Sequence, residues 1–327
     1  MAPTGRGCLR KRVGVSLAVT RAPTKNGPVT GAQSSAGPGR PPRIPTEAEL
    51  PPLLERTPLA IIDEAFTFLR TQPATLLGVA FVVLLPLRLI AVLLPGSGLR
   101  DARPDQLIDI LITSFDSTAG VISAVGTLLA DSLAVFVVGA IYGKLLASWF
   151  EQSAPLTSDL LVWSVKRSPI LAVLWLLIHL VELIAGAFSV GVGGIVAGVF
   201  LMVTAPILGA EGGGVRQSIS RSLALTAPRF FACLIVFVLV GVGGQVIRFV
   251  LRSLPTLLGV TVVPIPAWII SGVFDLLATT VVVAFTASSA LVLYLDLRVR
   301  KEGVDLEVAM GRVFPNRASR IVGASDG

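Results

Sequence analysis

Several ionisable side chains stand inside long apolar stretches of this sequence, where charges are costly and are by default candidates for function. They are Arg88, Asp131, His179, Glu182, Asp275 and, near the edge of a stretch, Arg248. A charge at the centre of a membrane-spanning helix costs about 2.5–3.5 kcal/mol, so these side chains should face the inside of a bundle and pair. We therefore predict one internal polar cluster, in which Arg88 compensates one or more of Asp131, Glu182 and Asp275. Three roles stay open: an ion pair that fixes helix register, a path for substrate or protons, and snorkelling to the surface.

His179 is the one histidine of the chain, and Glu182 follows three residues later on the same helical face. Two such ligands are a fragment of a metal site, since zinc and di-metal centres use three or four ligands. The two cysteines, Cys8 and Cys233, cannot form a disulfide framework or a Cys-based metal site. We expect no metal and no cofactor. No GxSxG motif occurs and the sequence offers His179 no recognisable partner serine, so we expect no enzymatic activity.

A second polar group lies in residues 207–230, ILGAEGGGVRQSISRSLALTAPRF. A glycine-rich turn before an Arg-bearing helix can cradle phosphate, but a Walker loop needs Lys-Ser/Thr after its last glycine, and here Val215 and Arg216 follow. We interpret the glycines as the end of a span. The residues predicted to lie at lipid headgroups or in this joint are Glu211, Arg216, Arg221 and Arg229, with Glu211 paired to one of the arginines.

The elements that position these residues are long apolar segments. Apolar residues make up 53% of the 327 residues and charged residues 14%, against about 25% charged in an average soluble protein. Runs of about 20 apolar residues recur, the length that crosses a bilayer as a helix. We predict an all-α integral membrane bundle of six transmembrane helices, at about 74–94, 118–142, 169–190, 192–210, 229–251 and 266–294.

The distribution of Lys and Arg predicts the orientation of the bundle. With both termini in the cytoplasm, 22 of the 27 basic residues fall in inner segments. The outer segments then hold Arg100, Arg103 and Arg252. The net charge of +7 follows from this bias, so we expect no nucleic-acid partner.

A short amphipathic stretch precedes each of the first, third and fifth spans. Each is followed by one or two polar residues and a proline (Pro73, Pro169 or Pro228) at the start of the span, where the first helical turn tolerates proline. The alternative is that any cytoplasmic entry to a span looks alike. We predict a threefold repeat of an interfacial amphipathic helix and a transmembrane hairpin. The three cytoplasmic interfacial helices come from PLAIIDEAFTFLRTQ (58–72), PLTSDLLVWSVKRS (155–168) and GVRQSISRSLALTA (214–227).

The remaining segments complete the predicted organisation. Residues 1–52 are interpreted as a disordered basic tail, 53–308 as the transmembrane domain, and 309–327 as a cytoplasmic tail. Residues 95–117 are predicted to form an outer interfacial helix or a half-buried loop. Two GxxxG patterns, Gly139–Gly143 and Gly194–Gly198, favour close packing within the monomer, with a dimer face as the alternative.

Three segments carry a family resemblance. YLDLRVRKEGVDLE, from Tyr294 to Glu307, resembles the closing motif of an uncharacterised actinobacterial multi-pass family that is related to the membrane domain of some glycerophosphoryl diester phosphodiesterases. The segment around Pro206 and Arg221 is similar to another motif of that family, and IIDEAFTFLRTQP to its first interfacial helix. The resemblance covers roughly 57–308. It implies a six-span bundle in a bacterial plasma membrane, and it does not imply the phosphodiesterase reaction, because the catalytic domain is absent.

These observations lead to three functional hypotheses. The first is a non-enzymatic membrane protein that acts at the inner leaflet as a lipid-associated scaffold or partner subunit, with anionic lipid headgroups, another membrane protein or a second copy of itself as partners. The second is a transporter or permease component that uses the buried charges. The third is a membrane-embedded hydrolase.

Overall fold

The computed structural model describes residues 56–93, 118–151, 153, 155–257 and 267–303. The predicted tails at 1–52 and 309–327 and the predicted outer helix at 95–117 lie outside these residues. Within the described ranges the regular structure is helical throughout. Six segments are long and apolar enough to cross a membrane. The predicted fold class, an all-α membrane bundle with six spanning segments, is therefore confirmed.

The spans follow the predicted order, and several are longer than their apolar parts. The helix α4 was predicted to end at 142 but continues through Lys144 to Phe150, and α11 continues past 294 to Glu302. Neither extension contains proline, so both helices continue beyond the point at which the sequence becomes less apolar. The spanning elements are α2 (Pro73–Leu93), α4 (Thr118–Phe150), α6 (Ser168–Phe188), α7 with α8 (Val192–Leu201 and Thr204–Glu211), α10 (Phe230–Leu257) and α11 (Ala267–Glu302).

The predicted fourth span is broken into two helices. The helix α7 ends at Leu201 and α8 begins at Thr204. Pro206 explains the break, because proline has no N–H to donate to the carbonyl of Met202 and its ring clashes with that carbonyl in a continuous helix. The helix α8 then ends at Gly212, whose φ of 69° is the left-handed conformation that glycine adopts at helix ends.

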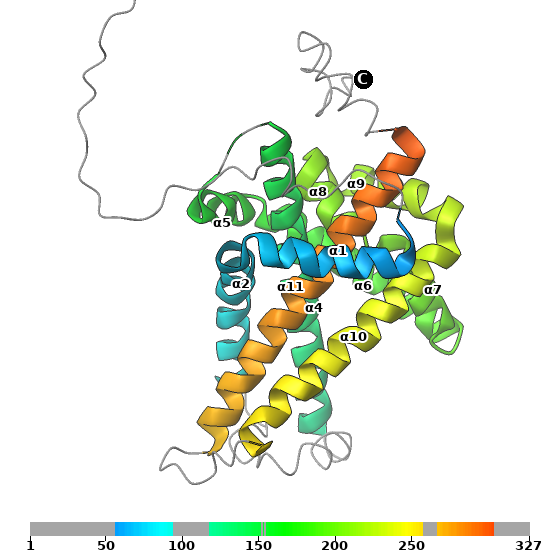
Figure 1. Ribbon diagram of the computed structural model, residues 1–327. Helices are drawn as coiled ribbons and strands as arrows, with labels where there is room; N and C mark the ends of the chain where they lie inside the picture. The colour runs from blue at the N-terminus through cyan, green and yellow to red at the C-terminus, as the bar shows by residue number, and fades with distance from the viewer. Residues whose placement is uncertain (1–55, 94–117, 152, 154, 258–266, 304–327) are drawn as a thin grey trace, which may run out of the picture. The chain divides into compact units, whose positions relative to one another are not determined.

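Each of the three stretches predicted to be interfacial contains a helix directly before a span. They are α1 (Pro58–Thr71), α5 (Thr157–Lys166) and α9 (Val215–Thr226). In α1, the Thr57 hydroxyl accepts a hydrogen bond from the amide of Ala60, and Pro58 occupies the first turn. One face of α1 is buried and packs across α11 and α10, as Figure 1 shows.

The order of helix, proline and span recurs three times in the structure. Pro73 begins α2, and Pro169 lies in the first turn of α6. Pro228 lies in a short 3-10 turn, η3 (Ala227–Arg229), that joins α9 to α10. Proline therefore lies at each of the three junctions between a short helix (α1, α5 or α9) and the span that follows it.

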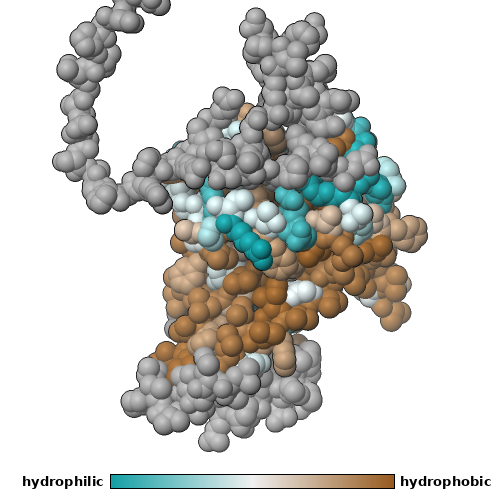
Figure 2. Space-filling view, viewed as in Figure 1, coloured by the Kyte–Doolittle hydropathy of each residue, from teal (hydrophilic) through white to brown (hydrophobic). Residues whose placement is uncertain are grey.

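The core of the bundle forms around α11. This helix packs against α10, α4, α1 and α2, and 72% of its apolar segment is buried, against 22% for α2. The Phe68 ring lies edge-on to Tyr142, whose hydroxyl donates to the carbonyl of Leu76 at 2.7 Å. Cys233 is fully buried as a small apolar side chain. On the face shown in Figure 2, apolar side chains form a broad band over α10 and α11, with polar side chains gathered toward the α1 end.

Glycines allow α4 and α8 to meet at their backbones. A Cβ atom added at Gly143 would overlap the carbonyl oxygen of Pro206, and one added at Gly209 would overlap that of Ala140. Gly139 faces Ala205 in the same contact. In the second GxxxG pattern, Gly194 faces the backbone of α6 and Gly198 faces Phe237. Both patterns therefore serve close packing within the chain.

Candidate functional site

Arginines and aspartates alternate across four helices to form what we call the Arg–Asp ladder. Arg88 of α2 lies at its centre and donates to the Asp131 carboxylate at 2.9 Å, while its other terminal nitrogen lies 3.4 Å from Asp275. Arg248 pairs with Asp131 at 3.1 Å, and Arg252 pairs with Asp275. The order along the ladder is Arg248, Asp131, Arg88, Asp275, Arg252. Its formal charge is +1.

The ladder connects α2, α4, α10 and α11 inside the membrane-spanning part of the bundle. Arg88 and Asp131 are both 8% exposed, and Arg88 also donates to the Thr279 hydroxyl at 3.0 Å. The pairing of Arg88 with both Asp131 and Asp275 agrees with the predicted compensation. Turning any one of the four helices about its axis would separate at least one of these ion pairs.

Two members of the ladder were not recognised as such from the sequence. Arg248 was identified as an ionisable residue at a span edge without a partner, and Arg252 was assigned to an outer segment. Both lie in α10, which extends to Leu257 rather than ending at 251. Their spacing of four residues places them on one helical face, and this spacing was the signal that could have placed them together.

His179 and Glu182 lie apart from the ladder, so the single predicted cluster is wrong in its membership. The two residues are on α6, which packs mainly on α7, whereas Arg88 is on α2 beside α4 and α11. The helix α4 contributes a residue to the ladder and another to the His179–Glu182 pair, because consecutive residues of a helix point about 100° apart around its axis. Asp131 joins the ladder and Ser132 joins His179, whose Nε2 atom lies 2.9 Å from the Ser132 hydroxyl.

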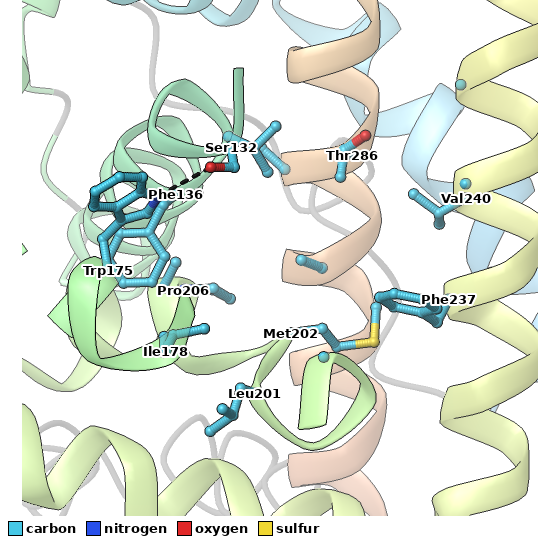
Figure 3. A pocket seen from close by; sticks show the side chains of 18 of the residues that line it. Ser132, Phe136, Trp175, Ile178, Leu201, Met202, Pro206, Phe237, Val240 and Thr286 are labelled. Carbon is cyan, nitrogen blue, oxygen red and sulfur yellow. Dashed lines mark hydrogen bonds between the residues drawn. The ribbon is translucent and has the colours of Figure 1, made fainter. Parts of the chain in front are cut away.

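A cavity of about 350 Å³ lies between α4, α6, α7, α8, α10 and α11. Figure 3 shows Ser132, Phe136 and Trp175 on one side and Met202, Phe237 and Val240 on the other. Most of the wall is apolar. The polar side chains that line it are Ser132, Trp175, His179, Glu182, Gln245 and Thr286.

The cavity is open at its edge. Gly241 and Gln245, which line it from the middle part of α10, are exposed, and the side chains of His179 and Glu182 are 28% and 27% exposed. These residues belong to spanning helices, so the opening lies on the side of the bundle, at the level of the spans. The cavity thus offers an apolar wall, a polar group and lateral access, the combination that amphipathic ligands use.

A separate network holds the joint between α8, α9 and α11. Arg221 pairs with Glu211 at 3.1 Å and also with Glu302, which confirms the predicted pairing of Glu211 with one of the arginines. The Tyr294 hydroxyl donates to Glu211 at 2.9 Å, and Arg298 pairs with Glu302 at 3.0 Å. Glu211 and Arg221 are therefore committed to contacts within the protein rather than to lipid headgroups.

The other two residues predicted for this joint have no ion-pair partner among the described residues. Arg216 is exposed on α9, and Arg229 is half-buried in η3. Arg70 at the end of α1 and Lys166 at the end of α5 are exposed in the same way. These cations near the ends of α1, α5 and α9 are available to anions outside the protein.

The backbone of Arg56, at the beginning of the described residues, is hydrogen-bonded to side chains near the end of α11. The amide of Arg56 donates to Asp296 at 2.7 Å across 240 residues of sequence, and Arg300 donates to the carbonyl of Arg56 at 2.8 Å. Burial lowers the pKa of Arg56 from its ordinary value, while the nearby Glu64 and Asp296 carboxylates act in the opposite direction.

Comparison with known proteins adds no relative. The chain matches no protein-family model, no curated protein and no solved structure. Within the described ranges, no three His, Cys, Asp or Glu side chains come together as metal ligands would.

Proposed function

We propose that this multi-pass membrane protein is a lipid-associated protein that holds part of an amphipathic lipid in the cavity between α4, α6, α7, α8, α10 and α11. The observation that supports this most directly is a largely apolar cavity, open on the side of the bundle at the level of the spans, with Ser132, His179 and Glu182 at one side. A lipid can enter from the membrane without crossing the ion pairs of the Arg–Asp ladder.

The size of the cavity defines the kind of occupant. Its volume of about 350 Å³ is near the lower end of the range of about 300–1,000 Å³ that is usual for small-molecule sites. A whole phospholipid does not fit. We infer that one polar group and the first part of an acyl chain occupy the cavity, while the rest of the lipid extends through the opening beside Gly241 and Gln245.

The basic side chains near α1, α5 and α9 support a second contact with lipid. Each Lys or Arg close to an anionic membrane surface contributes about 1 kcal/mol. Arg70, Lys166 and Arg216 are exposed and lie toward one end of the bundle, where Figure 1 shows α1, α5 and α9. We propose that they bind anionic headgroups, so that the protein acts as a scaffold or partner subunit at that leaflet.

The proposal includes a cellular location and a relationship to a protein family. The excess of Lys and Arg in alternate segments supports an orientation with both termini in the cytoplasm, and the family resemblance supports a bacterial plasma membrane. The motif from Tyr294 to Glu307 supports kinship with the actinobacterial multi-pass family named above.

Obstructing the opening of the cavity should remove the lipid that co-purifies with the protein. Gly241 lies at the opening of the cavity, and a Cβ atom added there meets nothing within 4 Å, so Gly241→Leu adds an apolar side chain at this opening without displacing backbone. We expect bound lipid, counted by native mass spectrometry of the detergent-purified protein, to fall about tenfold, as a loss of roughly 1.4 kcal/mol would produce.

Gly272→Leu is the matched control. Gly272 is exposed on α11, has equally open space for a Cβ atom and does not line the cavity. The lipid content of this variant should equal that of the unaltered protein. Equal lipid loss in both variants, or retention of lipid in Gly241→Leu, would contradict the proposed site.

A further inference from the structure

Ser132, His179 and Glu182 form a continuous chain of hydrogen bonds at the polar side of the cavity. The Ser132 hydroxyl lies 2.9 Å from Nε2 of His179, and Nδ1 of the same ring lies 2.6 Å from a carboxylate oxygen of Glu182. The order is hydroxyl, imidazole, carboxylate, and each ring nitrogen faces one partner. Sequence spacing concealed this arrangement, because Ser132 and His179 are 47 residues apart on different helices.

The carboxylate decides which ring nitrogen carries the hydrogen. An ionised Glu182 accepts but does not donate, so Nδ1 of His179 carries the hydrogen and Nε2 presents its lone pair to Ser132. The indole N–H of Trp175 donates to the Ser132 oxygen at 3.1 Å, which leaves the serine hydrogen for an acceptor. Two acceptors are in reach, Nε2 of His179 and the Leu129 carbonyl at 2.9 Å.

The imidazole is also held by packing. The Trp175 ring lies edge-on to that of His179, with centroids 5.0 Å apart, one helical turn away on α6. Glu182 is itself close to Gly198 of α7, where an added Cβ atom would lie 3.3 Å from its Oε1 atom. Base and carboxylate are therefore positioned by the α6–α7 hairpin, and the hydroxyl is presented by α4.

We propose that this group is a hydrolytic site that cleaves a carboxylic ester of the amphipathic lipid held in the cavity. The inference rests on the proposed function, because the cavity must first bring an ester to Ser132. It departs from the expectation of a non-enzymatic protein. That expectation rests on the sequence alone, which offers His179 no recognisable partner serine. A hydroxyl, a base and a carboxylate in this order are recognised by geometry rather than by sequence motif.

The reaction has two steps that share one base. The Ser132 oxygen attacks the ester carbonyl carbon, its proton passes to Nε2 of His179, and the bond to the leaving alkoxide breaks as the alkoxide takes that proton. The lipid alcohol departs and the acyl group stays on Ser132. Water then attacks the acyl carbon, gives its proton to Nε2, and the Ser132 oxygen leaves and recovers the proton. The products are one alcohol and one carboxylic acid.

Other polar groups of the cavity suit the remaining requirements. Polar side chains of the cavity can donate to the developing oxyanion. The indole N–H of Trp175 is already engaged by the Ser132 oxygen, whereas the side-chain amide of Gln245 lines the same cavity and is the donor that we assign to the oxyanion. The cluster of polar side chains also offers water the two to four partners that it needs in an enclosed site. Glu182 is a positioning residue, which orients His179 and stabilises the imidazolium.

Covalent labelling of the full-length purified protein tests the inference. A lipophilic fluorophosphonate should attach to Ser132, identified by peptide mass spectrometry, and the adduct should be lost in Ser132→Ala. His179→Gln keeps the serine, and its labelling rate should fall by about 10²–10⁴-fold because the base is missing. Ser253→Ala is the control, since Ser253 bonds back to the carbonyl of Phe249 outside the cavity and should leave labelling unchanged.

Glu182→Gln separates positioning from a merely structural role. Hydrolysis of a fluorogenic acyl ester in micelles should lose kcat with little change in KM, and its pH–rate profile should shift, because the imidazolium no longer faces a carboxylate. Unchanged unfolding temperature in this variant would show that the fold is intact. A profile and kcat equal to those of the unaltered protein would overturn the role of Glu182.

The outcomes distinguish this inference from the proposed function. An adduct on Ser132 that depends on His179 supports both. Co-purified lipid that is sensitive to Gly241→Leu, with no adduct on Ser132, overturns the hydrolytic site and leaves lipid binding in place. If the protein carries no co-purified lipid and Ser132 forms no adduct, both the proposed function and the hydrolytic site are overturned.

Discussion

Asp131→Asn should destabilise the protein by about 3–5 kcal/mol, more than the loss of the central cation Arg88. Asp131 is the single partner of Arg248 in the Arg–Asp ladder and one of two carboxylate partners of Arg88. Its replacement raises the formal charge of the ladder from +1 to +2 and leaves the partly buried guanidinium of Arg248 without its carboxylate, and the loss of one partner is the costly way to break such a pair. Arg88→Met instead leaves two complete pairs, Arg248 with Asp131 and Arg252 with Asp275, and a net charge of zero.

Unfolding of the purified protein in mild detergent, followed by denaturant titration, measures the difference. We expect Arg88→Met to cost about 1–2 kcal/mol, the range for lost hydrogen bonds and packing. The double variant Asp131→Asn/Arg248→Met restores the charge of +1 and should recover part of the loss. If Arg88→Met is the more destabilising substitution, the contribution of the ladder to stability depends on the central guanidinium of Arg88 and not on the net charge.

A methyl group added between α4 and α8 should be nearly as disruptive. Gly143→Ala places a Cβ atom against the carbonyl oxygen of Pro206, and Gly209→Ala places one against that of Ala140. The obstructing atoms are backbone, so no side-chain rotation relieves the overlap, and the two helices must separate. Overpacking in cores costs about 1–3 kcal/mol and occasionally more, and we expect about 3 kcal/mol for each variant.

Gly126→Ala is the control for this contact. It adds the same methyl group to the same helix, where nothing lies within 4 Å. Alanine favours helix over glycine by about 1 kcal/mol, so this variant should be neutral or slightly stabilising in the same denaturant titration. Loss of stability in Gly126→Ala, with Gly143→Ala unaffected, would show that the α4–α8 contact is not the reason for these glycines.

The sequence predicts the spans well because a span is a local property. Length, apolarity and proline position are read within one segment, and the six spanning segments and their order follow. The break before Thr204 was missed because composition alone treats 192–210 as continuous, although Pro206 marks it. A proline inside an apolar run is the local signal that would have found it.

The polar groups were predicted less well, because they depend on how helices rotate and which helices touch. The need for Arg88 to pair was evident from the cost of burying it, and its partners Asp131 and Asp275 were among those named. That Glu182 lies elsewhere, and that Ser132 faces His179, follows from the placement of α6 against α4. Neither periodicity nor spacing within one helix contains that information.

The central position of α11 has a consequence for biosynthesis. Synthesis proceeds from the amino terminus, so the other five spans leave the ribosome before the helix that packs at the centre and holds Arg56 at its far end. Until α11 enters the bilayer, Arg88 lacks Asp275 and α1 lacks the surface on which it rests. The ladder and the surface under α1 are therefore complete only in a chain whose last span has been inserted.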